Sequence, residues 1–171
     1  MSLIVETGAG LTNAESYISV ADTDAYWADV GNALWDALTE TEKEQALRRA
    51  TRFMAWIYRV KWAGRRTAQA QALDWPRYNV LVEDLPVPSN EVPLTVRQAC
   101  AELAIRAAAG PLLEDVDTGS SQIKKDKTGP LETEYFEAHV DPAERFLSIG
   151  AMLQPYFGGA GGSNSIKLVR G

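Results

Sequence analysis

Residues 39–64 read TETEKEQALRRATRFMAWIYRVKWAG and predict a long amphipathic helix. Thr39 and Glu42 have the spacing of a capping box, in which a hydroxyl and a carboxylate three residues later satisfy the first free N–H groups of a helix. Apolar residues then recur at helical intervals, and Gly64 suits a helix end. We therefore expect the helix to run from Thr39 to about Lys61.

The predicted helix has two unlike sides. At about 100° per residue, Arg48, Arg52 and Arg59 fall within about 40° of one another. The opposite side, which we expect to be buried, collects the apolar residues Leu47, Ala50, Met54, Ile57 and Tyr58. Trp56 lies about 60° to 80° from the arginines, at the edge of the buried side. Packing of Trp56 in the core is therefore favoured over stacking on a nucleic-acid base.

Positive charge is concentrated around this helix. Eight of the chain's seventeen Lys and Arg residues lie between Arg48 and Arg77, where Asp74 is the one acid. The segment therefore carries a formal charge of +7, which leaves −13 for the rest of a chain whose net charge is −6. The same segment holds three of the five tryptophans, Trp56, Trp62 and Trp75. Arginine and aromatic side chains together are typical of protein interfaces and of sites that hold a nucleic-acid strand.

Five arginines are the candidate interface or DNA-facing residues: Arg48, Arg52, Arg59, Arg65 and Arg66. For the three on the helix, the alternative is an ordinary solvated face, because surface helices commonly carry such charges. For the pair after Gly64, the alternative is a favourable interaction with the helix dipole. The acidic balance of the whole chain argues against unspecific binding of duplex DNA by its entire surface, but it is compatible with a local basic face.

The other predicted elements make the fold class mainly α: a small helical bundle with a β-hairpin and an extended C-terminal tail. A second capping pattern at Ser19 and Asp22 predicts a helix to about Val30. Further predictions are a short strand at 3–5, helices at 67–73, 93–107 and 142–154, an irregular connection at 79–91 and a hairpin at about 122–136.

Residues 1–157 are expected to form one helical domain, and residues 158–171 a separate tail. Residues 158–162, four glycines and Ala160, are typical of a flexible linker. The expected docking strand follows it and consists of Ile166, Lys167, Leu168, Val169 and Arg170. Such β-prone residues can add as a strand to another chain, and the alternative is a frayed terminus.

The sequence shows no catalytic pattern. His139 is the single histidine, so a metal cluster or an activated nucleophile would depend on one residue. Cys100, the single cysteine, excludes an internal disulfide, is expected to be buried and suggests a reducing compartment. We find no phosphate-binding glycine loop and no apolar run that could cross a membrane, and we expect no signal peptide. We expect a binding protein without cofactor or metal, not an enzyme.

Several blocks of the sequence carry a resemblance: Val5-Glu6-Thr7-Gly8, residues 13–17, 46–51, 62–66, 71–77 and 123–131, and the terminal glycine linker. In these blocks the chain resembles a family of tailed-bacteriophage proteins described as DnaT-like single-stranded-DNA-binding proteins. That family is related to head completion and head–tail connector (adaptor) proteins. The resemblance covers most of the chain, although its blocks identify no chemistry.

The resemblance implies a structural virion protein. Such a protein would form a ring of about twelve subunits under the portal and join the DNA-filled capsid to the tail. Its partners would be its own copies, the portal protein, tail or stopper proteins and DNA passing through the ring, with no membrane. It would be located in the virion neck, and in the host bacterial cytoplasm during assembly. The alternative is a DnaT-like single-stranded-DNA-binding protein, ranked second because the chain is acidic and shows no row of exposed aromatic residues.

Overall fold

The computed structural model describes residues 2–113, 125–128, 131–134 and 145–158. Its helices are α1 (Val20–Val30), α2 (Ala33–Asp36), α3 (Glu40–Tyr58), α4 (Leu94–Ala109) and α5 (Leu147–Leu153), followed by the 3-10 turn η1 (Gln154–Tyr156). Its strands are β1 (Arg65–Arg66), β2 (Arg77–Tyr78), β3 (Leu81–Val82), β4 (Leu85–Pro86), β5 (Lys125–Thr128) and β6 (Leu131–Glu134). They pair antiparallel as β1–β2, β3–β4 and β5–β6. The prediction of a mainly α helical bundle with a β-hairpin is confirmed.

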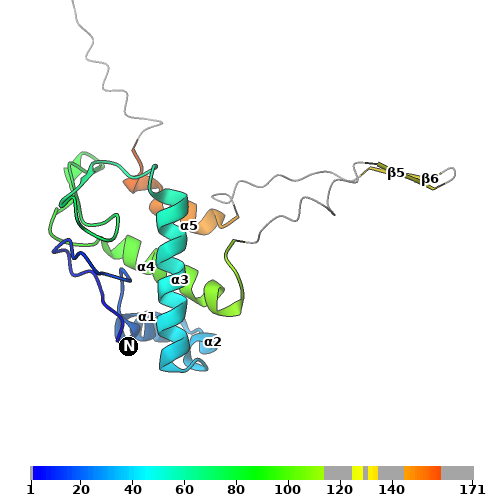
Figure 1. The fold of residues 1–171 in the computed structure, drawn as a ribbon, viewed down its shortest axis with the longest axis horizontal. Coiled ribbons are helices and arrows are strands. Elements are labelled where there is room, and N and C mark those ends of the chain that lie inside the picture. Colours follow the sequence, from blue (N-terminus) through cyan, green and yellow to red (C-terminus); the bar gives the residue numbers. More distant parts are fainter. Residues whose placement is uncertain (1, 114–124, 129–130, 135–144, 159–171) are drawn as a thin grey trace, which may run out of the picture.

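The core lies where α3 and α4 pack against each other. Figure 1 shows α3 in the middle of the bundle, with α1 and α2 beside its first turns and α5 near its far end. The buried side chains of α3 include Leu47, Ala50, Met54 and Tyr58, and those of α4 include Val96, Ala99, Cys100, Leu103 and Ala107. Burying this much apolar surface is the main force that holds the helices together. The expected buried sides are confirmed, except that Ile57 is only partly buried.

The helix starts follow the predicted caps. The hydroxyl of Ser19 accepts the N–H of Asp22 at 3.0 Å, and Gly31 ends α1 in a left-handed conformation at φ 82°. At α3, the N–H of Thr39 donates to the Glu42 carboxylate at 2.8 Å, which completes the capping box. These local signals are independent of tertiary structure, and the sequence located both helices within a few residues.

Residues 67–73 are not helical, so this prediction was wrong. The side chain of Gln71 is buried and forms hydrogen bonds with the backbone around it. Its Oε1 accepts the N–H of Ala68 at 2.9 Å, and its Nε2 donates to the carbonyls of Leu73 at 2.8 Å and Pro76 at 3.1 Å. A side-chain amide that satisfies nearby backbone groups replaces the helical ladder with a compact loop.

Smaller departures have equally local causes. The connection at 79–91, expected to be irregular, contains the β3–β4 hairpin, whose turn residues Glu83 and Asp84 have positive φ angles of 53° and 65°. That geometry is the usual one for a two-residue hairpin turn. The predicted strand at 3–5 is reduced to one bridge, between Val5 and Ser16. In the helix predicted at 142–154, the described α-helical part begins at Leu147, whose side chain is exposed.

The hairpin predicted at about 122–136 is confirmed where the structure describes it. β5 and β6 pair from Lys125 opposite Glu134 to Thr128 opposite Leu131. His139, the linker after Gly158 and the expected docking strand Ile166–Arg170 lie outside the described residues.

Candidate functional site

Arg48, one of the five candidate arginines, is engaged within the molecule. Its Nη2 donates to Oε2 of Glu15 at 3.0 Å, and its Nη1 donates to Oε2 of Glu44 at 3.2 Å. The N–H of Leu3 donates to the same Glu44, so the N-terminal segment packs along this side of α3. The hydrogen bond from Arg48 is the main reason that the pKa of Glu15 lies below its ordinary value. Arg48 therefore ties the N-terminal segment to α3.

Arg59 belongs with Arg77 to a polar network at the end of α3. Its Nε donates to Oδ1 of Asp74 at 3.0 Å. Burial raises the pKa of the Asp74 carboxyl, and the charge of Arg59 opposes that shift. The buried guanidinium of Arg77 donates to the carbonyl oxygens of Ala63 at 2.6 Å, Gly64 at 2.9 Å and Asp74 at 3.1 Å. These charges fix the loop that follows α3.

The blocks that carried the resemblance are largely scaffold. Trp75 is fully buried and packs edge-to-face on Trp62, with ring centroids 5.7 Å apart. Gly64 has a φ of 63°, and a Cβ there would lie 2.2 Å from the carbonyl oxygen of Tyr78. Both features explain why these residue types are needed at these positions. In the blocks 62–66 and 71–77, the side chains available to a ligand are therefore those on β1 and β2.

The opening block is also structural. The carboxylate of Glu6 is buried and accepts the N–H groups of Gly8, Gly10 and Leu11 at 2.8 to 2.9 Å. A Cβ on Gly8 would lie 2.0 Å from the carbonyl oxygen of Asn90. The loop is therefore held closed by Glu6 and packed tightly against the segment before α4.

An exposed face of α3 combines charge with an aromatic ring. Arg49, Arg52 and Trp56, which we call the α3 face, are all exposed, and the exposed fraction of Trp56 is 64%. The Arg52 guanidinium carbon lies 5.9 Å from the centroid of the Trp56 ring, a cation–π distance. Within the described part of the chain, neither arginine forms an ion pair.

The core position expected for Trp56 was wrong. Its physical cause is the N-terminal segment, which covers the Arg48 side of α3 through Glu15. Trp56 lies about 80° round the helix from Arg48, beyond the part that this segment covers, and is 64% exposed. The contact between Glu15 and Arg48 joins residues 33 positions apart, so helical periodicity alone could not reveal it.

A shallow hollow of about 210 Å³ adjoins the α3 face. Its lining residues are Arg49, Arg52, Phe53, Trp56, Pro111, Leu112 and Leu113. The last three follow α4, so the hollow is formed where the end of α4 approaches the middle of α3. Arg49 and the segment 111–113 were not among the predicted site residues, because only the packing of α4 on α3 brings them together.

The remaining candidates, Arg65 and Arg66, lie elsewhere. Both are exposed on β1, which pairs with Arg77 and Tyr78 of β2. Arg66 donates to the carbonyl oxygen of Gln71 at 3.2 Å. Figure 1 places this loop region near the C-terminal end of α3, whereas the α3 face lies along the middle of the helix. The five predicted arginines therefore do not form one site.

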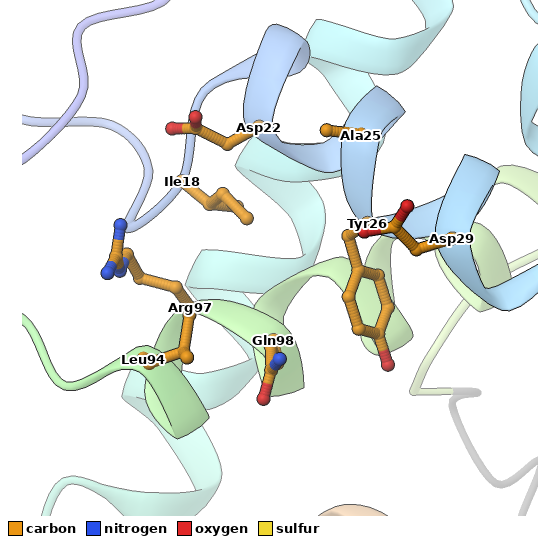
Figure 2. A pocket seen from close by; sticks show the side chains of 8 residues that line it. All are labelled: Ile18, Asp22, Ala25, Tyr26, Asp29, Leu94, Arg97 and Gln98. Atoms are coloured by element: carbon orange, nitrogen blue, oxygen red, sulfur yellow. The ribbon is translucent and has the colours of Figure 1, made fainter.

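A second hollow, of about 250 Å³, lies between α1 and α4 (Figure 2). Asp22 and Asp29 of α1 and Arg97 of α4 line it, so carboxylates outnumber guanidinium groups. Tyr26 also lines it and donates to Glu102 at 2.9 Å. Burial, together with this bond, raises the pKa of Tyr26 to about 12, and the hydroxyl stays neutral at pH 7. Two carboxylates would repel a phosphate backbone, so this hollow suits nucleic acid less well than the α3 face.

Groups suited to covalent or metal chemistry are not assembled in the described part of the chain. Cys100 is buried, as expected, and burial raises the pKa of its thiol. Among the described residues, no group of three or more His, Cys, Asp and Glu side chains could hold a metal ion. No helix in those residues is both long and apolar enough to span a bilayer.

Comparison with known proteins identifies the family. A family model described as "Putative DnaT-like ssDNA binding protein" matches residues 1–171. The chain belongs to this family. No curated protein and no solved structure matches the chain. The family description agrees with the alternative of a DnaT-like single-stranded-DNA-binding protein better than with the head–tail connector interpretation.

Proposed function

We propose that this protein binds single-stranded DNA through the α3 face. One observation carries the proposal: Trp56 is exposed and Arg52 lies over its ring. Bases of a single strand stack on exposed aromatic rings, and arginines beside the ring attract the phosphates. The family description supports the same class of ligand. The protein would act by binding, without catalysis.

The charge around Trp56 supports this role despite the acidic balance of the chain. Arg49 and Arg52 have no carboxylate partner within the described residues, so their charge is available to a phosphate. Arg48 and Arg59 are already paired with Glu15 and Asp74. Two free guanidinium groups can contact about two phosphates of a strand, and stacking of a base on Trp56 would add to that attraction.

Fluorescence anisotropy with a labelled oligothymidine tests the proposal. We expect micromolar or tighter binding at about 150 mM salt. Each arginine that contacts a phosphate of a single strand contributes about 0.7 to the slope of log K against log salt. The double variant Arg49→Gln/Arg52→Gln should therefore lower the magnitude of that slope by about 1.4.

The matched control is Arg65→Gln/Arg66→Gln, which removes the same charge from β1. It should keep the wild-type slope if the strand lies on the α3 face. Loss of binding in the control but not in Arg49→Gln/Arg52→Gln would move the site to β1. No binding by the wild-type protein would contradict the proposal.

The head–tail connector remains a second proposal, favoured by the distribution of charge along the bundle. Asp29, Asp36 and Glu40 are exposed at one end of α3, and Arg65 and Arg66 are exposed on β1 towards the other end, where Glu83 and Asp84 of the β3–β4 turn are also exposed. Unlike charges at opposite ends favour head-to-tail contacts between copies, and such contacts can close into a ring. In this proposal a ring of about twelve subunits, in the virion neck, would join the portal to tail or stopper proteins.

Analytical ultracentrifugation with and without the portal protein tests this second proposal. The wild-type chain should assemble on the portal, whereas Arg65→Glu/Arg66→Glu should remain a monomer. Deletion of 166–171 should also prevent attachment if Ile166–Arg170 docks on the portal or on a neighbouring subunit. A wild-type chain that stays monomeric with the portal present would contradict the connector proposal.

A further inference from the structure

We propose that the hollow beside Trp56 holds one unpaired nucleobase, so that the α3 face binds a strand only where a base has left its own stack. This inference rests on the proposed function and goes further, because it assigns the part of the strand that is recognised. The occupant is a base of a single strand, and the arginines contact the phosphates next to it.

The size of the hollow fits a single ring system. At about 210 Å³ it is smaller than the roughly 300 to 1,000 Å³ of sites that hold drug-sized ligands. Trp56 supplies exposed aromatic surface from α3, and Pro111 and Leu113 supply aliphatic surface from the segment after α4. The buried side chains of Phe53 and Leu112 form the floor of the hollow. A flat ring can lie against such walls, whereas a hydrated phosphate would lose its solvation there.

The positive charge beside the hollow favours a ring that carries an anionic group. Arg49 and Arg52 complete the lining, and both are exposed and without a carboxylate partner in the described residues. Apolar walls beside two free guanidinium groups match a ligand in which a flat ring is joined to an anion. A nucleotide within a strand has this composition.

Base pairing is incompatible with this arrangement. A base in a duplex is stacked on both faces and paired at its edge, and it enters a protein pocket only after it has been flipped out at a cost in free energy. A base in a single strand avoids most of that cost. The hollow therefore accounts for a preference for single strands that does not depend on DNA sequence.

The decisive probe is a strand without bases. We would compare an oligothymidine of about twelve nucleotides, a length within the usual range of single-strand sites, with an abasic deoxyribose-phosphate strand of equal length. Both carry the same phosphates. The wild-type protein should bind the abasic strand at least tenfold more weakly. Equal binding of the two strands would overturn base insertion and leave phosphate binding in place.

A variant that fills the hollow separates insertion from stacking on Trp56. Leu113→Trp should occupy the hollow and keep Arg49, Arg52 and Trp56, so its affinities for the two strands should come within about threefold of each other. If Leu113→Trp still prefers oligothymidine tenfold, the hollow is not the base site, although the α3 face can still bind DNA. If the wild-type protein binds neither strand, the proposed function itself fails.

A cross-linking experiment needs no substitution and covers the case in which Leu113→Trp does not fold. Oligothymidine that contains 5-iodouracil is irradiated with the wild-type protein, and the modified peptide is identified by mass spectrometry. Cross-links should fall on Phe53, Trp56 or residues 111–113. Cross-links confined to β1 or to the hollow between α1 and α4 would overturn the assignment.

Discussion

Two parts of the positively charged segment between Arg48 and Arg77 contain the same residue types but differ in their burial and in the partners of their arginines. In the loop after α3, Trp75 is fully buried and the guanidinium of Arg77 donates hydrogen bonds to three backbone carbonyl oxygens. In the middle of α3, Trp56 is exposed and Arg52 lies over it, without an ion pair in the described residues. Arginine and tryptophan build the scaffold in one place and remain exposed to solvent in the other. Charge counted along the sequence therefore overstates how much of it is available to a ligand.

The largest expected effect is on the scaffold. Arg77→Ala removes the donors of one buried and two partly buried carbonyl groups and a positive charge from the surroundings of Asp74. Its expected cost in unfolding free energy is about 3 to 5 kcal/mol, because the buried Asp74 carbonyl loses its donor and the buried Asp74 carboxylate loses a neighbouring positive charge. Urea denaturation followed by circular dichroism measures it. Arg77→Lys should recover little, because an ammonium group cannot span three carbonyls as a guanidinium does. A loss below about 1 kcal/mol for Arg77→Ala would show that the network is dispensable.

A smaller loss is expected at Tyr17, whose buried hydroxyl accepts the N–H of Asp74 at 3.0 Å. Tyr17→Phe leaves that N–H unsatisfied and should cost about 1 to 3 kcal/mol. Thermal unfolding of both proteins at pH 7 measures this loss. Unchanged stability would mean that the Asp74 N–H finds another acceptor.

Because of Tyr17, we also expect the folding stability to depend on pH in the alkaline range. Burial raises the pKa of its hydroxyl far above the ordinary value of about 10. In an unfolded chain the tyrosine ionises near pH 10, while in the folded protein it stays protonated, so folding stability is complete below that pH and falls as the pH rises above it. The fall should be less steep in Tyr17→Phe. An equal slope in the two proteins would contradict the assignment.

Local signals in the sequence predicted the framework well. The caps at Ser19 and Thr39 located the starts of α1 and α3, and the helix predicted at 93–107 corresponds to α4. The errors arose from side-chain contacts that helical periodicity does not show. Gln71 forms hydrogen bonds with backbone groups of its own loop, which takes the place of the predicted helix, and Glu15 pairs with Arg48 and so brings the N-terminal segment onto that side of α3. The candidate site was therefore predicted only in part. Arg52 was selected, whereas Arg49, Trp56 and the hollow depend on tertiary packing.

The smallest stability effects should separate Arg48 from Arg52. Arg48→Ala breaks two ion pairs and should cost up to about 1 kcal/mol, a loss that decreases as salt screens the wild-type pairs. Arg52→Ala should change the unfolding free energy by less than about 0.5 kcal/mol, since its side chain is exposed and contacts only Trp56 among the interactions described. Denaturation at low and high salt compares the two variants. A salt-independent loss in Arg48→Ala would mean that packing, not charge, holds the N-terminal segment.

Tryptophan emission tests the central claim, that the α3 face and not the loop after α3 binds single-stranded DNA. All five tryptophans lie in the described residues, and the exposed fractions of Trp27, Trp35, Trp62 and Trp75 are between 0 and 5%, so quenching by a ligand in solution reports on Trp56. Titration with oligothymidine should quench the emission of the wild-type protein, and the emission of Trp56→Phe should not respond although its circular dichroism is unchanged. Oligothymidine that binds by anisotropy without quenching the wild-type emission, or that quenches Trp56→Phe equally, would contradict the account.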